Sequence, residues 1–586
     1  MRDQFLLDPI DHLDFHHRLG VECANLEKMI TSGSYMPGQS RRILIEKSKG
    51  LCRQLVIPNV RDAIILQSLS DGLYADIRGR APTSNSFFEP QDHTFSASNK
   101  LINEPEYGSF KAWLNFQKEI FRFSKNRQYM IVTDIANFYD SISYTHLRNV
   151  ISDLIDVREP VLDMLIFVLS GLLWQPDYMP RIEVGLPQIN LDAPRILAHC
   201  FLYELDEYLQ SIAPGDFVRF MDDIDVGVDT IQRAKEILKC IDLVLQTRHV
   251  RLNSGKTLIL RSSEAREHFR VRENFLLDMA VKRINTKVAA GISVARERES
   301  LVNAIRTMHR RKRFDTGNGE KILKRMFNIS ARIGADVDQK ILLDTLIRRP
   351  GSRGSALNLI SRLPLTRART STVRKFVQSG MIVDDGSFID TANYLVDSLA
   401  PNKRAVDQNL ADIRDDFPTE SLFSLYGRIW LTSKYGSPDE LLNLLITCQP
   451  SWSSDTWLGR LVGGLYPLFL RHADEPRFRS IVVGSGNPDA YDVYQFHDEL
   501  HHDPKRFEMT YDYLRAINIS KRTGISHPRF LLILSALSNS KINVKKKEKL
   551  KQTHSLAWSD AYYRSTARRC LGITFPVTPF SIPPVP

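Results

Sequence analysis

The sequence predicts an α+β region over residues 1–290, followed by an all-α region over residues 291–586. In the first region, short β-rich runs such as YMIVTDI (129–135) and FVRFMDDIDVGV (217–228) stand among amphipathic helical segments. After about residue 295 the strand-like runs fade, and helical segments separated by short Gly, Pro or Ser breaks recur. A chain of 586 residues is also too long for one ordinary core, so more than one domain is expected.

Composition and charge narrow the functional classes. Hydrophobic residues make up 43% and charged residues 25%, values typical of folded proteins rather than disordered ones. A net charge of +11 favours polyanionic partners. The six cysteines are scattered without zinc-site spacing, which predicts reduced thiols in a cytoplasm. The first residues lack a signal-peptide pattern and the apolar run 161–174 is too short to span a bilayer, so we expect no membrane contact.

The all-α prediction rests on amphipathic segments of similar length. Examples are GEKILKRMFNISARIG (319–334) and VDQKILLDTLIRR (337–349). Their spacing favours stacked helix pairs, although no strict repeat signature is visible. A degenerate solenoid of HEAT type is the prediction, and an irregular helical bundle is the alternative.

Carboxylates mark the ends of the strands in the first region. Asp134 directly follows the apolar run 129–133, which is predicted to be a strand. Asp222 and Asp223 lie at the turn of a predicted hairpin. Asp222 and Asp223 could also be ordinary turn residues without a catalytic role, because Asp is favoured in turns. If the strands are neighbours, however, three carboxylates converge and raise one another's pKa unless a cation neutralises them. Two Mg²⁺ ions held there could activate a 3′-hydroxyl and stabilise a leaving pyrophosphate, so the pattern predicts nucleotide polymerisation.

The segments TDIANFYDSI (133–142) and FMDD (220–223) resemble motifs A and C of reverse transcriptases, with Phe220 in place of the usual tyrosine. Residues 46–69 are similar to the fingers segment of that family, residues 185–209 to motif B and residues 251–260 to motif D. These motifs follow the family's order over most of residues 43–260. The resemblance implies a reverse transcriptase fingers and palm domain in the first region.

The resemblance also implies roles for individual residues. It makes Asp134, Asp222 and Asp223 catalytic, and it places two Mg²⁺ ions, which Mn²⁺ could replace, at Asp134, Ile135, Asp222 and Asp223. The residues expected to contact the nucleotide are Lys49 (or Lys47 in its place), Arg53, Tyr139, Gln188 and Lys256. Tyr139 would exclude a ribose 2′-hydroxyl and so favour dNTPs. Each of these residues also has a simpler structural interpretation. Lys49 and Arg53 could belong to an exposed basic loop, Tyr139 could pack in the core, and Lys256 could be an ordinary solvated lysine.

One position departs from the family. Ile189 stands where motif B usually has glycine, and a β-branched side chain there is expected to crowd the template path. About 290 helical residues follow the last motif directly, which is similar to the bacterial abortive-infection (Abi) and related anti-phage defence reverse transcriptases. In that group a HEAT-like helical region replaces the thumb and the protein oligomerises.

By this resemblance, the protein is expected to be a bacterial, cytoplasmic, homo-oligomeric defence polymerase. It would add dNTPs without a template and attach the DNA product to one of its own hydroxyl groups. Tyr35 is the priming candidate, with Tyr562 and Tyr563 as others. One alternative is a templated defence reverse transcriptase that copies a partner noncoding RNA. Another is a catalytically silent scaffold that binds nucleic acid or a phage protein.

Overall fold

The computed structural model of the chain describes residues 6–88, 110–175, 178–180, 183–189, 191–516 and 526–575. The chain forms two compact units. The sheet unit comprises Leu26–Ile43 and Gln54–Phe275, and the helical unit comprises Arg2–Asn25, Leu44–Arg53 and Leu276–Pro586. The compact units therefore divide at 275/276, and the boundary at 290/291 stays a prediction. The structure confirms a mixed α/β region followed by a largely helical region. The HEAT-type character of the helical region stays a prediction.

The sheet unit is built on a five-stranded sheet with the order β3-β5-β6-β4-β7. The central strand β6 is antiparallel to β5 and β4, β7 is antiparallel to β4, and β3 is parallel to β5. A separate two-stranded hairpin is formed by β1 and β2. The strands are β1 (Arg41–Ser48), β2 (Leu51–Ile57), β3 (Ser86–Phe87), β4 (Tyr129–Asp134), β5 (Phe217–Phe220), β6 (Asp223–Val228) and β7 (Leu258–Arg261).

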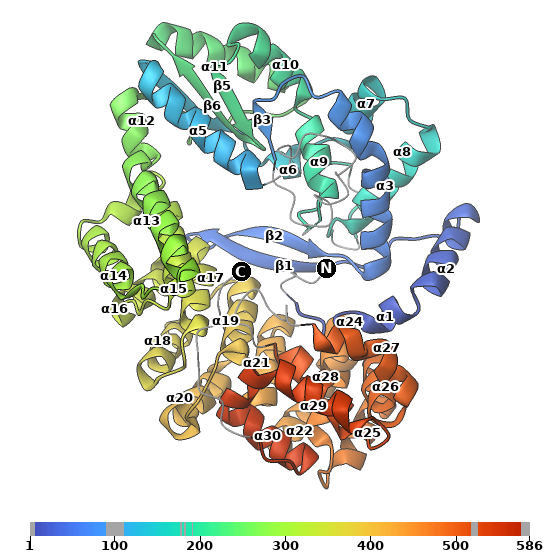
Figure 1. Ribbon diagram of the computed structural model, residues 1–586. Helices are drawn as coiled ribbons and strands as arrows, with labels where there is room; N and C mark the ends of the chain where they lie inside the picture. The colour runs from blue at the N-terminus through green and yellow to red at the C-terminus, as the bar shows by residue number, and fades with distance from the viewer. Residues whose placement is uncertain are drawn as a thin grey trace. The chain divides into compact units, whose positions relative to one another are not determined.

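Side-chain alternation along the strands creates a core on each face of the sheet. Ile131 and Val226 belong to the larger core, which includes α8, α9 and α11, whereas Met130 and Val218 pack with α5 and α12 on the other face. Figure 1 shows α5 lying along β5 and β6. The helices of this part of the chain are α3 (Val60–Gly79), α5 (Phe110–Asn126), α6 (Phe138–Ser141), α7 (Tyr144–Leu154), α8 (Glu159–Leu172), α9 (Ala193–Cys200), α10 (Tyr203–Ile212), α11 (Ile231–Gln246) and α12 (Ser262–His268).

Many helices of the helical unit stack on the next but one along the chain. Helix α15 packs on α17, α17 on α19 and α19 on α21, while α16 packs on α18 and α18 on α20 (Figure 1). Later pairs follow the same rule, with α24 on α26, α26 on α28 and α28 on α30. This pairing of alternate helices buries the apolar stripe that the sequence pattern gives each helix.

The remaining helices are α1 (Leu13–His17), α2 (Leu19–Thr31), α13 (Val271–Ala289), α14 (Ala295–Arg310), α15 (Gly319–Ile333), α16 (Gln339–Arg348), α17 (Arg353–Arg362), α18 (Arg367–Val377), α19 (Asp385–Asp397), α20 (Lys403–Asp416), α21 (Leu422–Tyr435), α22 (Pro438–Thr447), α23 (Gln449–Ser453), α24 (Thr456–Gly463), α25 (Glu475–Gly484), α26 (Pro488–His502), α27 (Pro504–Arg515), α28 (His527–Ser538), α29 (Val544–Thr553) and α30 (Ala561–Leu571). None of the described helices combines the length and the apolar character needed to cross a membrane.

A buried ion pair ties distant helices of the helical unit together. The Nζ atom of Lys434, at the end of α21, lies 3.2 Å from Oδ2 of Asp560, and both side chains are 0% exposed. Lys434 also donates to the backbone carbonyls of Val396 and Ser398 at 2.8 Å. Asp560 accepts a hydrogen bond from the backbone N–H of Ala400 at 2.8 Å. The burial of these charges is therefore compensated by hydrogen bonds as well as by the pair itself.

A second buried network holds the tip of the β1–β2 hairpin within the helical unit. Arg353, which is 3% exposed, contacts Glu46 Oε2 of β1 at 2.8 Å and Asp384 Oδ1 at 3.1 Å. The backbone N–H of Leu44 donates to Asp385 Oδ2 at 2.8 Å. These contacts explain why Leu44–Arg53 groups with the helical unit, although the hairpin begins and ends in the sheet unit.

Candidate active site at the sheet edge

The strand register brings the predicted catalytic carboxylates to one end of the sheet. In the antiparallel pairing of β4 with β6, Asp134 lies directly opposite Asp223. Asp222 precedes Asp223 in the two-residue connection between β5 and β6. The backbone N–H of Ile135 donates to the carbonyl oxygen of Asp222 at 3.3 Å, which links the end of β4 to this turn. The structure therefore brings Asp134, Ile135, Asp222 and Asp223 together, as the sequence predicts.

The three carboxylates differ in burial and in their contacts. Asp134 is 7% exposed, Asp222 is half-buried and Asp223 is exposed. Oδ2 of Asp134 accepts a hydrogen bond from Nζ of Lys256 at 2.5 Å, which places this predicted nucleotide-contacting residue at the carboxylates. Oδ1 of Asp134 is buried and, among the described residues, has no hydrogen-bond partner. A buried anionic oxygen without a donor is costly unless a cation binds it.

Burial and mutual repulsion act on the titration of this cluster. The pKa of Asp222 is raised above its ordinary value by burial first, and then by the charges of Asp223 and Asp134. The pKa of Lys256 is raised by its hydrogen bond to Asp134, with further contributions from the charges of all three carboxylates. Lys256 is therefore a cation that partly balances the cluster, but its side chain is 68% exposed.

The donor set fits divalent ions of the magnesium type. Mg²⁺ is bound in proteins through a few carboxylates and substrate phosphate oxygens. Asp134 offers a buried oxygen that has no hydrogen-bond partner among the described residues. Asp223 lies opposite Asp134 in the strand register and Asp222 lies in the adjoining turn, although the ligand atoms of the three do not all lie within 4.8 Å of one another. These residues could hold the two ions that the sequence motifs imply.

Tyr139 and Gln188, both predicted to contact the nucleotide, lie on two segments that pair with each other. The backbone N–H of Leu186 donates to the carbonyl of Tyr139 at 2.7 Å, and that of Gly185 donates to Ile142 at 2.8 Å. Nε2 of Gln188 donates to Oδ1 of Asp140 at 3.3 Å. Tyr139 itself is half-buried. The structure thus brings these two residues together, and their contact with a nucleotide stays a prediction.

Lys49 and Arg53 lie on the hairpin tip that groups with the helical unit. Lys49 has a positive φ of 53° and is followed by Gly50 at φ 80°, which makes a tight turn between β1 and β2. The side chains of Lys47, Lys49 and Arg53 are all exposed. Their role in triphosphate binding stays a prediction.

Two residues that the sequence singles out, Ile189 and Tyr35, are buried in the structure. Ile189 is 7% exposed and packs in the larger core of the sheet unit, because burial of its apolar side chain is favourable. Its effect on template handling stays a prediction. Tyr35 is 6% exposed, and its hydroxyl donates to Oδ1 of Asp62 at 2.7 Å. In this conformation the Tyr35 hydroxyl is buried, so its priming role has no structural support.

The other tyrosines considered for priming are also buried. Tyr562 is 3% exposed and its hydroxyl donates to Oδ1 of Asp407 at 2.7 Å. Tyr563 is 1% exposed and stacks on Phe530 with ring centroids 4.1 Å apart. Both side chains therefore serve the packing of α30 in this conformation.

Sequence reasoning missed a buried ion pair beneath the turn. Arg219, in β5, and Asp206, in α10, are both 0% exposed and are hydrogen bonded to each other. The available signal was an arginine within the apolar run FVRF, because a charge inside a buried strand requires a partner. Nothing in the sequence identified Asp206 as that partner.

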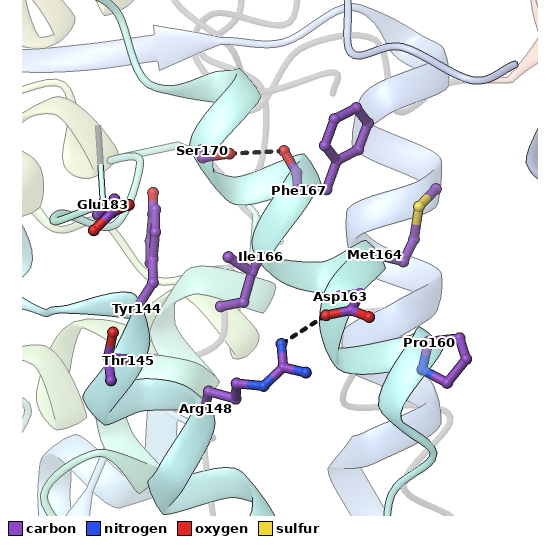
Figure 2. Close-up of a pocket in the computed structure, with 10 residues that line it drawn as sticks. All are labelled: Tyr144, Thr145, Arg148, Pro160, Asp163, Met164, Ile166, Phe167, Ser170 and Glu183. Carbon is purple, nitrogen blue, oxygen red and sulfur yellow. Dashed lines mark hydrogen bonds and ion pairs between the residues drawn. The ribbon is translucent and has the colours of Figure 1, made fainter. Parts of the chain in front are cut away.

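The sheet unit also contains an open pocket of about 670 Å³ between α7 and α8. Figure 2 shows Arg148 at its rim, reaching Oδ1 of Asp163 at 2.8 Å, with Ile166 and Phe167 from α8 and Tyr144 from α7 around it. The predicted metal-binding and nucleotide-contacting residues are not among those that line it. This pocket is therefore separate from the carboxylate cluster.

A second acidic group lies in the helical unit. Ligand atoms of Asp439, His472 and Asp474 all lie within 4.8 Å of one another. Nη1 of Arg477 lies 3.1 Å from Oδ1 of Asp474, so an arginine already balances part of this charge. Asp439 is exposed, and the arrangement is that of a surface ion-pair network.

Comparisons with known proteins give distant relatives. No family model matches the chain. "Protein YkfC" of Escherichia coli (strain K12) is 26% identical over 212 residues, which cover 35% of this chain and 49% of that protein. The "Uncharacterized 91 kDa protein in cob intron" of Schizosaccharomyces pombe is 28% identical over 179 residues, which cover 30% of this chain and 19% of that protein. The chain thus matches half or less of the length of these curated relatives.

Among solved structures, the chain is similar to apo telomerase from Candida tropicalis, with 10% sequence identity and a TM-score of 0.25. The match covers 71% of this chain and 74% of that chain. A likeness at this score carries no argument about fold or function.

Proposed function

We propose that the chain is a metal-dependent nucleotidyltransferase of the reverse transcriptase type, which adds dNTPs to a hydroxyl group. The observation that carries the proposal is the register of β4 and β6, in which Asp134 lies opposite Asp223 and next to the turn that holds Asp222. Independent support comes from the sequence motifs, whose order and content resemble those of reverse transcriptases.

In the proposed mechanism, Asp134, Asp222 and Asp223 would hold two divalent ions. Bound ions of this kind activate the attacking hydroxyl group and neutralise charge on the transferring phosphoryl group. Lys256, which donates to Asp134, is positioned to neutralise negative charge that builds up on the phosphates. Tyr139 and Gln188 would orient the sugar and base, because the pairing of their segments fixes them relative to each other.

The finer proposal is a homo-oligomeric, bacterial anti-phage enzyme that works without a template and from a protein hydroxyl. Its support is the resemblance to the Abi and related defence reverse transcriptases, in which a helical region follows the last motif directly. The burial of Tyr35, Tyr562 and Tyr563 gives no support to any of these three as the primer.

Incubation of the purified protein with each labelled dNTP, Mg²⁺ and no nucleic acid tests the proposal. Incorporation into a covalently labelled protein band supports untemplated, protein-primed synthesis. Labelling that requires an added template and primer, or a co-purifying RNA, supports templated synthesis instead. Absence of incorporation under all of these conditions would indicate a scaffold rather than an enzyme.

A matched pair of variants separates chemistry from folding. Asp222→Asn removes a carboxylate from the cluster, whereas Asp229→Asn removes one just beyond the other end of β6. Asp229 is exposed and pairs with Arg127 at 2.6 Å. We expect Asp222→Asn to abolish incorporation and Asp229→Asn to retain it. Equal activity in the two variants would contradict the proposed site.

A further inference from the structure

The guanidinium group of Arg219 is completely buried beneath the turn that carries Asp222. Its Nε donates to Oδ1 of Asp206 at 2.7 Å, and Nη2 pairs with Oδ2 of the same carboxylate. Nη2 also lies 3.4 Å from the carbonyl oxygen of His199. Nη1 donates to the carbonyl oxygen of Met221 at 2.7 Å. One side of the arginine is therefore fixed by an ion pair, and the other side holds the turn.

The turn itself has an unusual backbone. Met221 has a φ of 55°, in the left-handed region that a residue with a Cβ atom adopts only at a cost. Its N–H donates to the carbonyl of Phe87 at 3.0 Å, and its carbonyl accepts from Arg219. The next carbonyl, that of Asp222, accepts from Ile135. The peptide groups on both sides of Asp222 are thus held by neighbours outside the turn.

The negative charge of Asp206 balances the positive charge of Arg219. His199 is the titratable neighbour, and burial together with the charge of Arg219 keeps its pKa well below the ordinary value, so it is neutral. Among the described residues, the carboxylate of Asp206 is the one that pairs with Arg219. Buried pairs of this kind contribute little net stability compared with apolar residues of similar volume. The main structural effect of the pair is therefore to hold the Arg219 guanidinium group in place for its hydrogen bond to the carbonyl oxygen of Met221.

We propose that Arg219, oriented by Asp206, is a positioning residue that fixes the Met221–Asp222 turn so that the Asp222 carboxylate can share metal ions with Asp134. This inference rests on the proposed function. Asp222 reaches the cluster from a two-residue turn, and a small rotation of its peptide would move the carboxylate away from Asp134. Groups that orient a metal ligand typically change metal affinity by about 10- to 100-fold when removed.

The test measures Mn²⁺ binding by electron paramagnetic resonance, together with thermal unfolding and the Mg²⁺ dependence of dNTP incorporation. The main variant is the double substitution Arg219→Met with Asp206→Leu, which replaces the pair by apolar side chains. Arg219→Lys is the second variant, because lysine keeps the charge beside Asp206 but lacks the planar fork that reaches Met221. Arg127→Met is the control, since it removes the ion pair with Asp216 at the other end of the sheet.

We expect the double variant and Arg219→Lys to remain folded and to bind Mn²⁺ about 10-fold or more weakly, with a matching rise in the Mg²⁺ needed for half-maximal activity. Arg127→Met should bind Mn²⁺ as the unmodified protein does. Unchanged Mn²⁺ affinity in Arg219→Lys and in the double variant overturns the inference and leaves the proposed function standing. If the unmodified protein shows no Mn²⁺ binding that depends on Asp222, the proposed function fails and the inference fails with it.

Discussion

Replacing Asp222 by asparagine should make the fold more stable when no divalent ion is present. The pKa of Asp222 is raised by burial and then by Asp223 and Asp134, so its ionised form is disfavoured in the folded state. Lys256 attracts it and offsets part of this repulsion. Asparagine keeps the shape of the side chain and removes the charge. The expected result is a protein that gains stability and loses activity.

The size of the gain follows from the charges around the turn. Asp222 is repelled by two carboxylates and attracted by one ammonium group, so one repulsive pair remains uncompensated. At an effective dielectric constant of about 20, two unit charges about 4 Å apart interact by about 4 kcal/mol, and the interaction weakens with distance. Because Asp223 is exposed, solvent screening reduces this value, and we expect a net gain of about 1 kcal/mol. That corresponds to a rise of about 2–4 °C in the melting temperature of a unit of this size.

The gain must depend on pH with a definite sign. The folded-state pKa of Asp222 lies above its ordinary value of 3.8. A carboxyl group shifted in this direction contributes stability that is fully present below the unfolded pKa and is lost as the pH rises through the folded pKa. The advantage of asparagine is therefore present at neutral pH and shrinks as the pH falls through the folded pKa toward 3.8.

Thermal unfolding in EDTA at neutral pH, repeated at acidic pH and in Mg²⁺, measures the effect. Added Mg²⁺ should stabilise the unmodified protein and reverse the order of the two melting temperatures, because a bound ion contributes only to the folded state. Asp229→Asn is the control and should lose up to about 1 kcal/mol, since it breaks an exposed pair with Arg127. A lower melting temperature for Asp222→Asn in EDTA would refute the argument that the carboxylates repel one another.

Four further outcomes are expected. Asp134→Asn should lower dNTP incorporation by about 100-fold or more, because it removes the negative charge of the carboxylate whose buried Oδ1 has no partner among the described residues. Tyr139→Ala should raise the ratio of ribonucleotide to deoxynucleotide incorporation by about 10-fold or more in competition assays, if its ring contacts the sugar. Arg353→Met should increase hydrogen exchange of the amides in residues 44–53, measured by mass spectrometry, because it removes a buried anchor of the hairpin tip. Lys434→Met should lower the free energy of unfolding in urea by about 3–5 kcal/mol, because its buried carboxylate partner is left without a counter-charge.

Local patterns in the sequence predicted the strands that build the site. The run 129–133 ends in Asp134, and β4 spans Tyr129–Asp134 in the structure. The apolar residues of α11 (Ile231–Gln246) likewise recur at helical spacing in the sequence. These elements could be predicted because alternation and helical periodicity are properties of neighbouring residues. The convergence of the carboxylates followed once the two strands were taken as neighbours.

Long-range contacts could not be predicted in the same way. Residues 31–40 (TSGSYMPGQS) are rich in small and polar residues, yet Tyr35 is buried and hydrogen bonded to Asp62, which is 27 residues away. The preference of Ile189 for the core likewise depends on how the loop 185–189 packs, and not on its place in a motif. In both cases tertiary burial outweighs the local signal.

The hairpin tip shows how far such contacts extend along the chain. Glu46 is 307 residues from Arg353, and neither residue stands out in its own segment. Their pairing nevertheless assigns the tip, and with it Lys49 and Arg53, to the helical unit.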